Sequence, residues 1–182
     1  HAGAGLTTVI CPRAAMPVLQ QEVPNATCLA AEDQPTPKCD ALLMGCGIAE
    51  NDDTYADMMR LKATDAYQVW DAGALNLLAG HPQQLGARAV ITPHAGEAAR
   101  LLGWEIPAVL SDKLGAAEAL RAKYGCNVVL KSAVTVMLTV DGQQCALNAV
   151  GSPALAKGGS GDALAGILLA LLGFGLPPLQ AA

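Results

Sequence analysis

Leu155 to Gly175, LAKGGSGDALAGILLALLGFG, is the stretch that decides the fold of this chain. Its loop Gly158 to Asp162 has glycine at three of its first four positions, so the backbone can adopt positive φ and approach a ligand closely. The Leu- and Ala-rich run Ala163 to Phe174 predicts a buried helix that ends at Gly175, with Pro177 just beyond. A glycine turn before a helix presents free N–H groups and the positive end of the helix dipole, which suits phosphate binding.

Asp162 at the start of this helix has two interpretations. It carries the same sign of charge as a phosphate, so beside a bound phosphate it would handle a proton and would not hold the anion. Aspartate is also a favoured N-cap residue, and the loop could then be a capped surface turn without a ligand. The motif alone leaves both interpretations open.

The composition predicts an aliphatic core. The 182 residues are 52% hydrophobic but only 3% aromatic, and this length is typical of one domain with a substantial core. A core of Ala, Val, Ile and Leu favours a buried parallel sheet covered by helices.

The charge and the hydropathy pattern exclude two classes of partner. The net charge of −5 offers no basic surface for nucleic acid. The longest apolar stretch, Ala163 to Phe174, is too short to cross a bilayer, and the N-terminus lacks the pattern of a signal peptide. We therefore expect a soluble cytoplasmic protein that binds neither nucleic acid nor membranes.

The six cysteines have no CxxC spacing. Several lie in apolar, strand-like runs, so we expect reduced, small core residues and not disulfides or metal ligands. They are Cys11, Cys28, Cys39, Cys46, Cys126 and Cys145.

Strand and helix patterns alternate along the whole chain, which predicts an α/β fold with a mostly parallel sheet covered on both faces. Strands are expected at Leu6 to Cys11, Thr27 to Ala31, Asp40 to Met44, Ala66 to Asp71, Ala87 to Thr92 and Asn127 to Lys131, followed by a hairpin of Val134 to Val140 and Gln144 to Asn148. A helix is expected at Arg13 to Gln21, a second begins at the acidic run Glu50 to Asp53 and ends near Lys62, and a third spans Ala72 to Leu78. A fourth runs from the segment Pro93 to Glu97 as far as Leu102, and a fifth runs to Tyr124 with Ser111 as its cap. The acidic run is interpreted as a solvated helix start and not as a metal site.

Three groups lie at or just after the carboxyl ends of predicted strands, which is where α/β sheets bind ligands. They are the turn Gly45-Cys46-Gly47, His94 within Pro93 to Glu97, and Lys131. Each also has a purely structural interpretation: a tight turn, a lone histidine without a function, and a solvated strand end. The residue types alone do not decide between them.

Several separated stretches resemble the ADP/ATP-dependent NAD(P)H-hydrate dehydratases of the ribokinase-like superfamily. The resemblance covers nearly the whole chain, and the Thr-Pro-His-x-Gly-Glu segment makes it specific to this family. The stretches are ITPHAGEAARLLG (Ile91 to Gly103), VVLKSAVTV (Val128 to Val136) and GSPALAKGGSGDALAGILLALL (Gly151 to Leu172), with AGAGL near the start and DAGALNLL (Asp71 to Leu78) in matching order.

The resemblance implies a metabolite-repair lyase with a ribokinase-like fold. The family returns hydrated NADH and NADPH (NADHX and NADPHX) to NADH and NADPH at the expense of a nucleotide phosphate, by phosphorylating the ring hydroxyl and then eliminating the phosphate. By position, Asp162 would be the base that deprotonates the hydroxyl, and it would contact the substrate together with His94, Gly45 and Gly47.

The same resemblance implies an adenine-nucleotide site for ADP or ATP. Nucleotide binding would fall on Lys131, Ser132, Ala133, Val134 and Thr135, together with Gly159, Ser160 and Gly161, and the N–H groups of Gly159 to Gly161 would stabilise the transferring phosphoryl group. Mg²⁺ is expected with the nucleotide, held mainly by phosphates and water, so no protein ligands for the metal are assigned.

The chain departs from the family pattern in places. Gly45-Cys46-Gly47 stands where the family commonly has Gly-Pro-Gly, Gly73 where it has Asp, and Lys131-Ser132 where Lys-Gly is commoner. Relative to the family, residues 1–182 are expected to form a single ribokinase-like domain that lacks segments at both ends. Exposed sheet edges would then favour a homo-oligomer or another partner.

Two alternatives to the dehydratase stay open. One is an ATP-dependent small-molecule kinase of the same superfamily, which would use the same base and loop. The other is an inactive nucleotide-binding domain, suggested by the missing ends and by Gly73.

Overall fold

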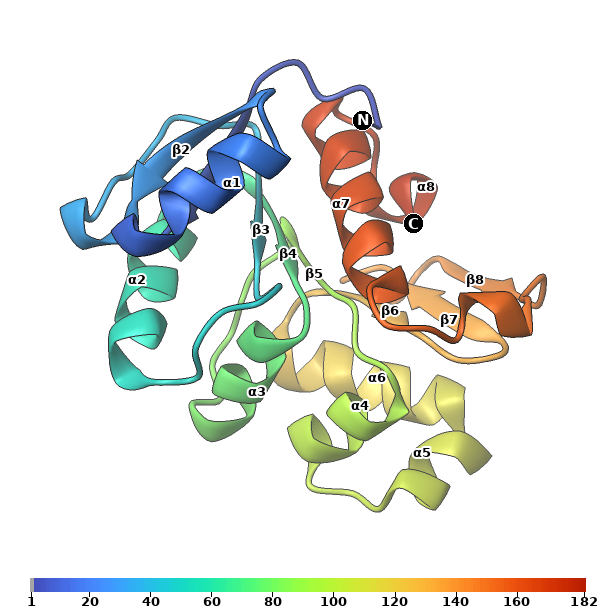
Figure 1. Ribbon diagram of the computed structural model, residues 1–182. Helices are drawn as coiled ribbons and strands as arrows, with labels where there is room; N and C mark the ends of the chain where they lie inside the picture. Colours follow the sequence, from blue (N-terminus) through green and yellow to red (C-terminus); the bar gives the residue numbers. More distant parts are fainter. Residues whose placement is uncertain (1) are drawn as a thin grey trace. The chain divides into compact units, whose positions relative to one another are not determined.

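The computed structural model describes residues 2–182 (Figure 1). The chain divides into two compact units, His1–Cys39 and Asp40–Ala182. The prediction that residues 1–182 form a single domain stays a prediction.

The first unit is a small parallel βαβ arrangement. Strands β1 (Thr7–Cys11) and β2 (Ala26–Ala30) pair in parallel with Thr7 opposite Ala26. Between them lie a 3-10 turn, η1 (Arg13–Ala15), and helix α1 (Met16–Glu22), and a second turn, η2 (Ala31–Asp33), follows β2. Both predicted strands and the predicted helix are therefore present, but β1 and β2 form a sheet of their own.

The second unit contains a six-stranded sheet in the order β3-β4-β5-β6-β7-β8. Strands β3 to β6 are parallel, and β7 and β8 continue the sheet as an antiparallel hairpin, as predicted. The strands are β3 (Ala41–Met44), β4 (Tyr67–Trp70), β5 (Ala89–Ile91), β6 (Asn127–Leu130), β7 (Thr135–Leu138) and β8 (Cys145–Asn148).

Helices lie on both faces of this sheet, with α7 on one face and α3, α4 and α6 on the other (Figure 1). Val69, Val90 and Val129 lie on neighbouring strands and point to the same face of the sheet. They form one buried hydrophobic cluster with Leu168 and Leu172 of α7. The helices are α2 (Asp52–Lys62), α3 (Gly73–Gly80), α4 (Ala95–Leu102), α5 (Ile106–Ser111), α6 (Lys113–Tyr124), α7 (Ser160–Gly173) and α8 (Pro178–Ala181), with a 3-10 turn, η3 (Pro153–Leu155), before α7.

Helix α7 is only partly buried, which corrects the prediction of a wholly buried helix. Ala165, Leu168 and Leu172 are in the core, but Ile167 is 49% exposed, and Phe174, the C-cap residue, is 60% exposed. The sequence is apolar all round, so its pattern could not distinguish the covered face from the open one. The helix also ends two residues earlier than predicted, at Gly173.

The predicted helix cap at Ser111 is wrong. Helix α5, which the sequence reading missed, ends at Ser111, and Asp112 caps α6 by accepting a hydrogen bond from the Gly115 N–H at 2.8 Å. The hydroxyl of Ser111 instead donates to the Ala108 carbonyl oxygen. Both residues are good N-caps, so the sequence alone does not distinguish which of the two begins the helix.

Replacing Asp112 with Ala should therefore lower the free energy of unfolding by about 1 kcal/mol, since one N–H of α6 loses its acceptor. Ser111→Ala is the matched control and should change stability by less than about 0.5 kcal/mol. Urea unfolding followed by circular dichroism measures both. Equal losses for the two variants would contradict the assignment of the cap.

All six cysteines are free, as expected, but they are not all core residues. Cys11 and Cys126 are buried, whereas Cys39 and Cys145 are exposed. Within the described residues, no helix has the length and apolar character needed to span a membrane.

Candidate active site

The parallel strands β3 to β6 end at the same edge of the sheet, and each end carries a polar or glycine-rich group. Gly45-Cys46-Gly47 follows β3, Asp71 follows β4, His94 lies just after β5, and Lys131 follows β6. An isolated parallel β-bridge between the backbones of His94 and Lys131 extends the pairing of β5 with β6 beyond the ends of these strands. This is the edge at which α/β sheets bind ligands.

The turn after β3 is pressed against the end of β4. The Gly73 N–H donates to the Gly45 carbonyl oxygen at 3.2 Å, and the Asp71 N–H donates to the Met44 carbonyl oxygen at 3.1 Å. Gly45 has φ +126°, and a Cβ there would lie 1.6 Å from the Asp71 carbonyl oxygen. Only glycine permits this approach, so the turn geometry depends on Gly45.

Gly45→Ala should lower the free energy of unfolding by about 3 kcal/mol or more, because the backbone of Asp71 must move and the positive φ is strained. Gly47→Ala is the matched control, since Gly47 also has positive φ, +70°, but has open space around it. It should cost about 1 kcal/mol. Denaturant unfolding of both variants tests the difference, and equal costs would contradict the close approach.

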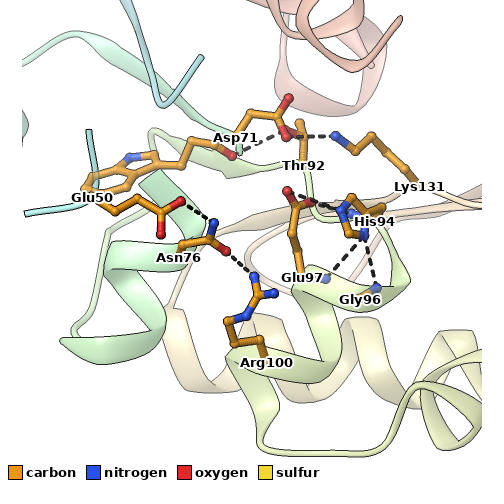
Figure 2. A network of polar contacts seen from close by, with 10 residues as sticks. Glu50, Asp71, Asn76, Thr92, His94, Gly96, Glu97, Arg100 and Lys131 are labelled. Atoms are coloured by element: carbon orange, nitrogen blue, oxygen red, sulfur yellow. Dashed lines mark hydrogen bonds and ion pairs between the residues drawn. The ribbon is translucent and has the colours of Figure 1, made fainter. Parts of the chain in front are cut away.

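Asp71 and Lys131 form a buried ion pair across the sheet edge (Figure 2). The Lys131 Nζ lies 2.7 Å from an Asp71 carboxylate oxygen, and the side chains are 19% and 3% exposed. Lys131 is therefore not a solvated strand end. A carboxylate as buried as Asp71 needs a partner of this kind, because an unpaired charge there would be strongly disfavoured.

The glycine loop leads into α7 without a side-chain cap. Gly159 is the N-cap residue with φ 85°, and among the described residues no side chain makes a capping hydrogen bond to this helix. Asp162 lies inside that first turn and its side chain is exposed, so the interpretation of Asp162 as the N-cap is wrong. Among the predicted phosphate donors, the Ser160 N–H is engaged with the Lys157 carbonyl oxygen at 3.3 Å.

Three side chains from three separate elements meet beside this helix start. The Cys46 sulfur and carboxylate oxygens of Asp71 and Asp162 all lie within 4.8 Å of one another. Gly161 completes the cluster, since a Cβ added there would lie 3.3 Å from the Lys131 Nζ and 3.7 Å from Asp71. The structure thus brings Asp162, Gly161 and Lys131 together around Asp71, a residue that the sequence reading did not select.

Cys46 keeps its proton in this cluster. Burial raises the pKa of its thiol to about 12, and a hydrogen bond with Asp162 and the charges of Asp162 and Asp71 act in the same direction. At neutral pH the thiol is therefore protonated.

His94 has a clear structural role at the start of α4. Its Nδ1 accepts from the Gly96 and Glu97 N–H groups at 3.0 and 3.3 Å, and Glu97 accepts from the His94 N–H at 2.8 Å (Figure 2). This is a capping box. The imidazole remains 59% exposed, so the same ring that caps the helix can also face a ligand.

A polar chain that the sequence reading missed extends from this helix. Arg100 donates to the Asn76 side-chain oxygen, and Asn76 donates to a Glu50 carboxylate oxygen at 2.5 Å (Figure 2). These residues come from three separate segments, so no local pattern could indicate the contact.

The predicted nucleotide segment Lys131 to Thr135 forms the connection from β6 to β7. The Ser132 hydroxyl donates to the Val134 carbonyl oxygen, and the Thr135 hydroxyl donates to the Ser132 carbonyl oxygen at 3.3 Å. Ala133 is exposed, and its carbonyl oxygen would lie 3.3 Å from a Cβ added at Gly151. The segment is therefore a structured loop beside the ion pair.

The family model described as NAD(P)H-hydrate dehydratase matches residues 1–182. The chain belongs to this family. A curated relative, the bifunctional NAD(P)H-hydrate repair enzyme Nnr of Vibrio cholerae, is 44% identical over 79% of this chain. An ADP-dependent (S)-NAD(P)H-hydrate dehydratase of Neisseria meningitidis is 36% identical over 78% of it. The matched part covers 28% of the length of the first relative and 50% of the second.

Solved structures agree with this assignment. The ADP/ATP-dependent NAD(P)H-hydrate dehydratase from Bacillus subtilis, co-crystallised with ATP and Mg²⁺ and soaked with CoA, is 26% identical with a TM-score of 0.84 and covers 99% of this chain and 68% of its own. A ribokinase-like superfamily protein from Enterococcus faecalis is 28% identical with a TM-score of 0.80, over 94% of this chain and 62% of its own. The predicted ribokinase-like α/β fold is therefore confirmed.

Proposed function

We propose that this NAD(P)H-hydrate dehydratase family chain carries out ADP- or ATP-dependent dehydration of NADHX and NADPHX to NADH and NADPH. The observation that carries the proposal is the exposed carboxylate of Asp162 in the first turn of α7, beside the Lys131–Asp71 ion pair. A carboxylate beside a helix N-terminus and an ammonium group supports the proposal, because the N-terminus and the ammonium both favour a phosphoryl group and the carboxylate could accept a proton.

In the first step, Asp162 takes the proton of the ring hydroxyl while the hydroxyl oxygen attacks the terminal phosphorus of the nucleotide. The bond from phosphorus to the bridging oxygen of the nucleotide breaks, and the shortened nucleotide leaves with the electron pair. The N–H groups of the Gly159 to Gly161 loop would stabilise the charge on the transferring group, with the Ser160 N–H contributing only if it leaves its Lys157 acceptor.

In the second step, the phosphorylated ring loses inorganic phosphate. The C–O bond breaks and its electron pair leaves with the phosphate, while the neighbouring ring carbon loses a proton to solvent and its C–H electron pair forms the C=C bond of the dihydronicotinamide. The net reaction converts the hydrate and one nucleotide phosphoanhydride bond into NADH or NADPH, inorganic phosphate and the shortened nucleotide.

The remaining predicted residues divide between the two ligands. We propose that His94, Gly45 and Gly47 contact the nicotinamide part, because they follow β3 and β5 at the edge that also holds Asp162. The nucleotide would lie against Lys131, Ser132, Ala133, Val134 and Thr135 and the loop Gly159, Ser160 and Gly161.

The residues fit a Mg²⁺ that is held by nucleotide phosphates and water. Asp71 is already paired with Lys131, and a thiol such as that of Cys46 is a poor ligand for Mg²⁺. Asp162 is then the one exposed carboxylate of this cluster, so the cluster offers no complete set of protein ligands for the metal. When bound, Mg²⁺ would neutralise charge on the phosphates. Assembly as a homo-oligomer and a cytoplasmic location are part of the same proposal.

The test incubates the purified chain with hydrated NADH, Mg²⁺ and either ADP or ATP, and follows the near-ultraviolet absorbance of reduced nicotinamide. The proposal predicts an absorbance rise that needs the nucleotide and fails with a β,γ-methylene analogue of ATP. Accumulation of a stable phosphorylated substrate without NADH would indicate the kinase alternative. Nucleotide binding in calorimetry without turnover would indicate the inactive domain, and either result overturns the proposal.

A further inference from the structure

We propose that Asn76 is a positioning residue for binding of the hydrated nicotinamide substrate, because its side chain holds the loop of residues 45–50, which contains Gly47. This inference rests on the proposed function, in which Gly47 contacts the nicotinamide part. The two partners of Asn76 are Glu50 at the end of this loop and Arg100 on α4 (Figure 2). Asn76 itself lies on α3, so one side chain joins three separate segments.

The loop is attached to α3 and to the residues around its start at three points. At its beginning, the Gly73 N–H donates to the Gly45 carbonyl oxygen at 3.2 Å. In its middle, Ile48 lies against α3, since a Cβ added at Gly73 would lie 2.9 Å from Cγ1 of Ile48. At its end, the side-chain amide of Asn76 donates to a Glu50 carboxylate oxygen at 2.5 Å. The loop is therefore held on both sides of Gly47.

Gly47 itself stays open to a ligand. A Cβ added at Gly47 would have no atom of the described residues within 4 Å. The loop contains no helix or strand between the end of β3 and the start of α2, so its position depends on its contacts. The hydrogen bond from Asn76 fixes the part of the loop that follows Gly47, and it thereby sets where the Gly47 backbone can meet the substrate.

Arg100 determines which way the Asn76 amide points. A guanidinium has only donors and an ionised carboxylate only accepts, so the amide oxygen faces Arg100 and the amide NH₂ group faces Glu50. Arg100 projects from α4, which is anchored in the core by its buried residues Ala98 and Leu101. A fixed helix thus orients the amide, and the amide holds the loop.

The arrangement requires a donor and an acceptor at position 76. An aspartate there would still accept from Arg100, but it has no donor and would repel the Glu50 carboxylate. Asn76→Asp should therefore raise the Kd of hydrated NADH by about tenfold, and Glu50→Ala, on the exposed loop side of the same bond, should have a similar effect. The Kd of ATP with Mg²⁺ should stay within about twofold, since the bond does not touch the proposed nucleotide residues. Isothermal titration calorimetry measures each ligand alone.

Exchanging the donor and the acceptor tests the bond itself. Glu50→Gln keeps an oxygen that can accept from Asn76, so it should raise the Kd of hydrated NADH by less than about threefold. In the double variant of Asn76→Asp with Glu50→Gln, the introduced amide can donate to the introduced carboxylate, and the Kd should return to within about threefold of the original. A general disturbance of α3 would persist in the double variant, because it still lacks the Asn76 amide.

Gln143→Glu is the control for the added negative charge. Gln143 is exposed in the turn between β7 and β8. Leu138 at the end of β7 pairs with Val128 near the start of β6, so this turn lies at the opposite edge of the sheet from the candidate site. The substitution should leave both dissociation constants unchanged. Urea unfolding of every variant shows whether it is folded.

The outcomes separate this inference from the proposed function. A Kd of hydrated NADH that stays within about twofold in both Asn76→Asp and Glu50→Ala overturns the positioning role, and so does a rise that the double variant does not reverse. If the unsubstituted chain binds the hydrate but does not convert it, the proposed function fails, whereas the calorimetry still decides the positioning role. A chain that does not bind the hydrate at all overturns both.

Discussion

Asp162→Asn should reduce the kcat of dehydration by roughly a thousandfold, the range expected when a general base is removed. The amide keeps the shape of the side chain but cannot accept the hydroxyl proton. Since Asp162 is exposed in the first turn of α7 and caps no helix, the fold should be unaffected. The measurement is the steady-state rate of NADH formation with saturating hydrated NADH and nucleotide.

Asp52→Asn is the matched control for this prediction. Asp52 is also an exposed aspartate in the first turn of a helix, α2, so the substitution removes the same charge from the same type of position. Its kcat should equal that of the unsubstituted chain, and both variants should bind nucleotide within a few fold. An Asp162→Asn variant with more than a tenth of the original kcat would show that Asp162 is not the base.

Lys131→Met should lower the free energy of unfolding by about 3 kcal/mol, because it leaves the buried Asp71 carboxylate without its charged partner. The value is at the lower end for a broken buried pair, since the Lys131 side chain is 19% exposed and water can partly replace it. Urea unfolding with a linear extrapolation measures the change.

Two further variants identify the cause of this loss. Adding Asp71→Asn to Lys131→Met removes the unpaired charge and should restore a large part of the stability. The pair Arg88–Asp65 has the same N–O distance, 2.7 Å, but its side chains are 53% and 93% exposed, so Asp65→Asn should leave the unfolding curve unchanged. If Lys131→Met unfolds like the original chain, the ion pair contributes nothing to the fold.

The sequence was sufficient to predict the succession of strands and helices along the chain and the sheet edge at which the candidate site lies. Parallel strands bounded by glycines and helix caps have local patterns, and their carboxyl ends must lie at one edge. Asp71 was missed because its partner Lys131 is 60 residues away and no local pattern links them. An aspartate directly after the apolar strand Tyr67–Trp70 was the available signal.

Other features depended on packing that no single segment determines. Whether the faces of the apolar helix α7 are covered or open depends on its neighbours, and the separate pairing of β1 with β2 is a long-range property. His94 was selected as a substrate contact, and its capping of α4 became visible only with the backbone of Gly96 and Glu97 in place.

The departure at Gly73 also has a structural context. A Cβ added at Gly73 would lie 2.9 Å from Cγ1 of Ile48, so the aspartate common in the family would require Ile48 to move. The Gly45 carbonyl oxygen would lie 3.2 Å from the same Cβ. The proposed base, Asp162, is a different residue, and its carboxylate lies in the cluster with Asp71 and Cys46.

The most direct test of the proposed reaction follows the oxygen atom of the ring hydroxyl. NADHX labelled with oxygen-18 at this hydroxyl is converted by the chain with unlabelled ATP and Mg²⁺, and the released phosphate is analysed by phosphorus NMR. Phosphorylation of the hydroxyl followed by elimination predicts that the label appears in inorganic phosphate. Unlabelled phosphate together with recovered NADH would mean that the hydroxyl leaves as water without being phosphorylated, and would contradict the mechanism.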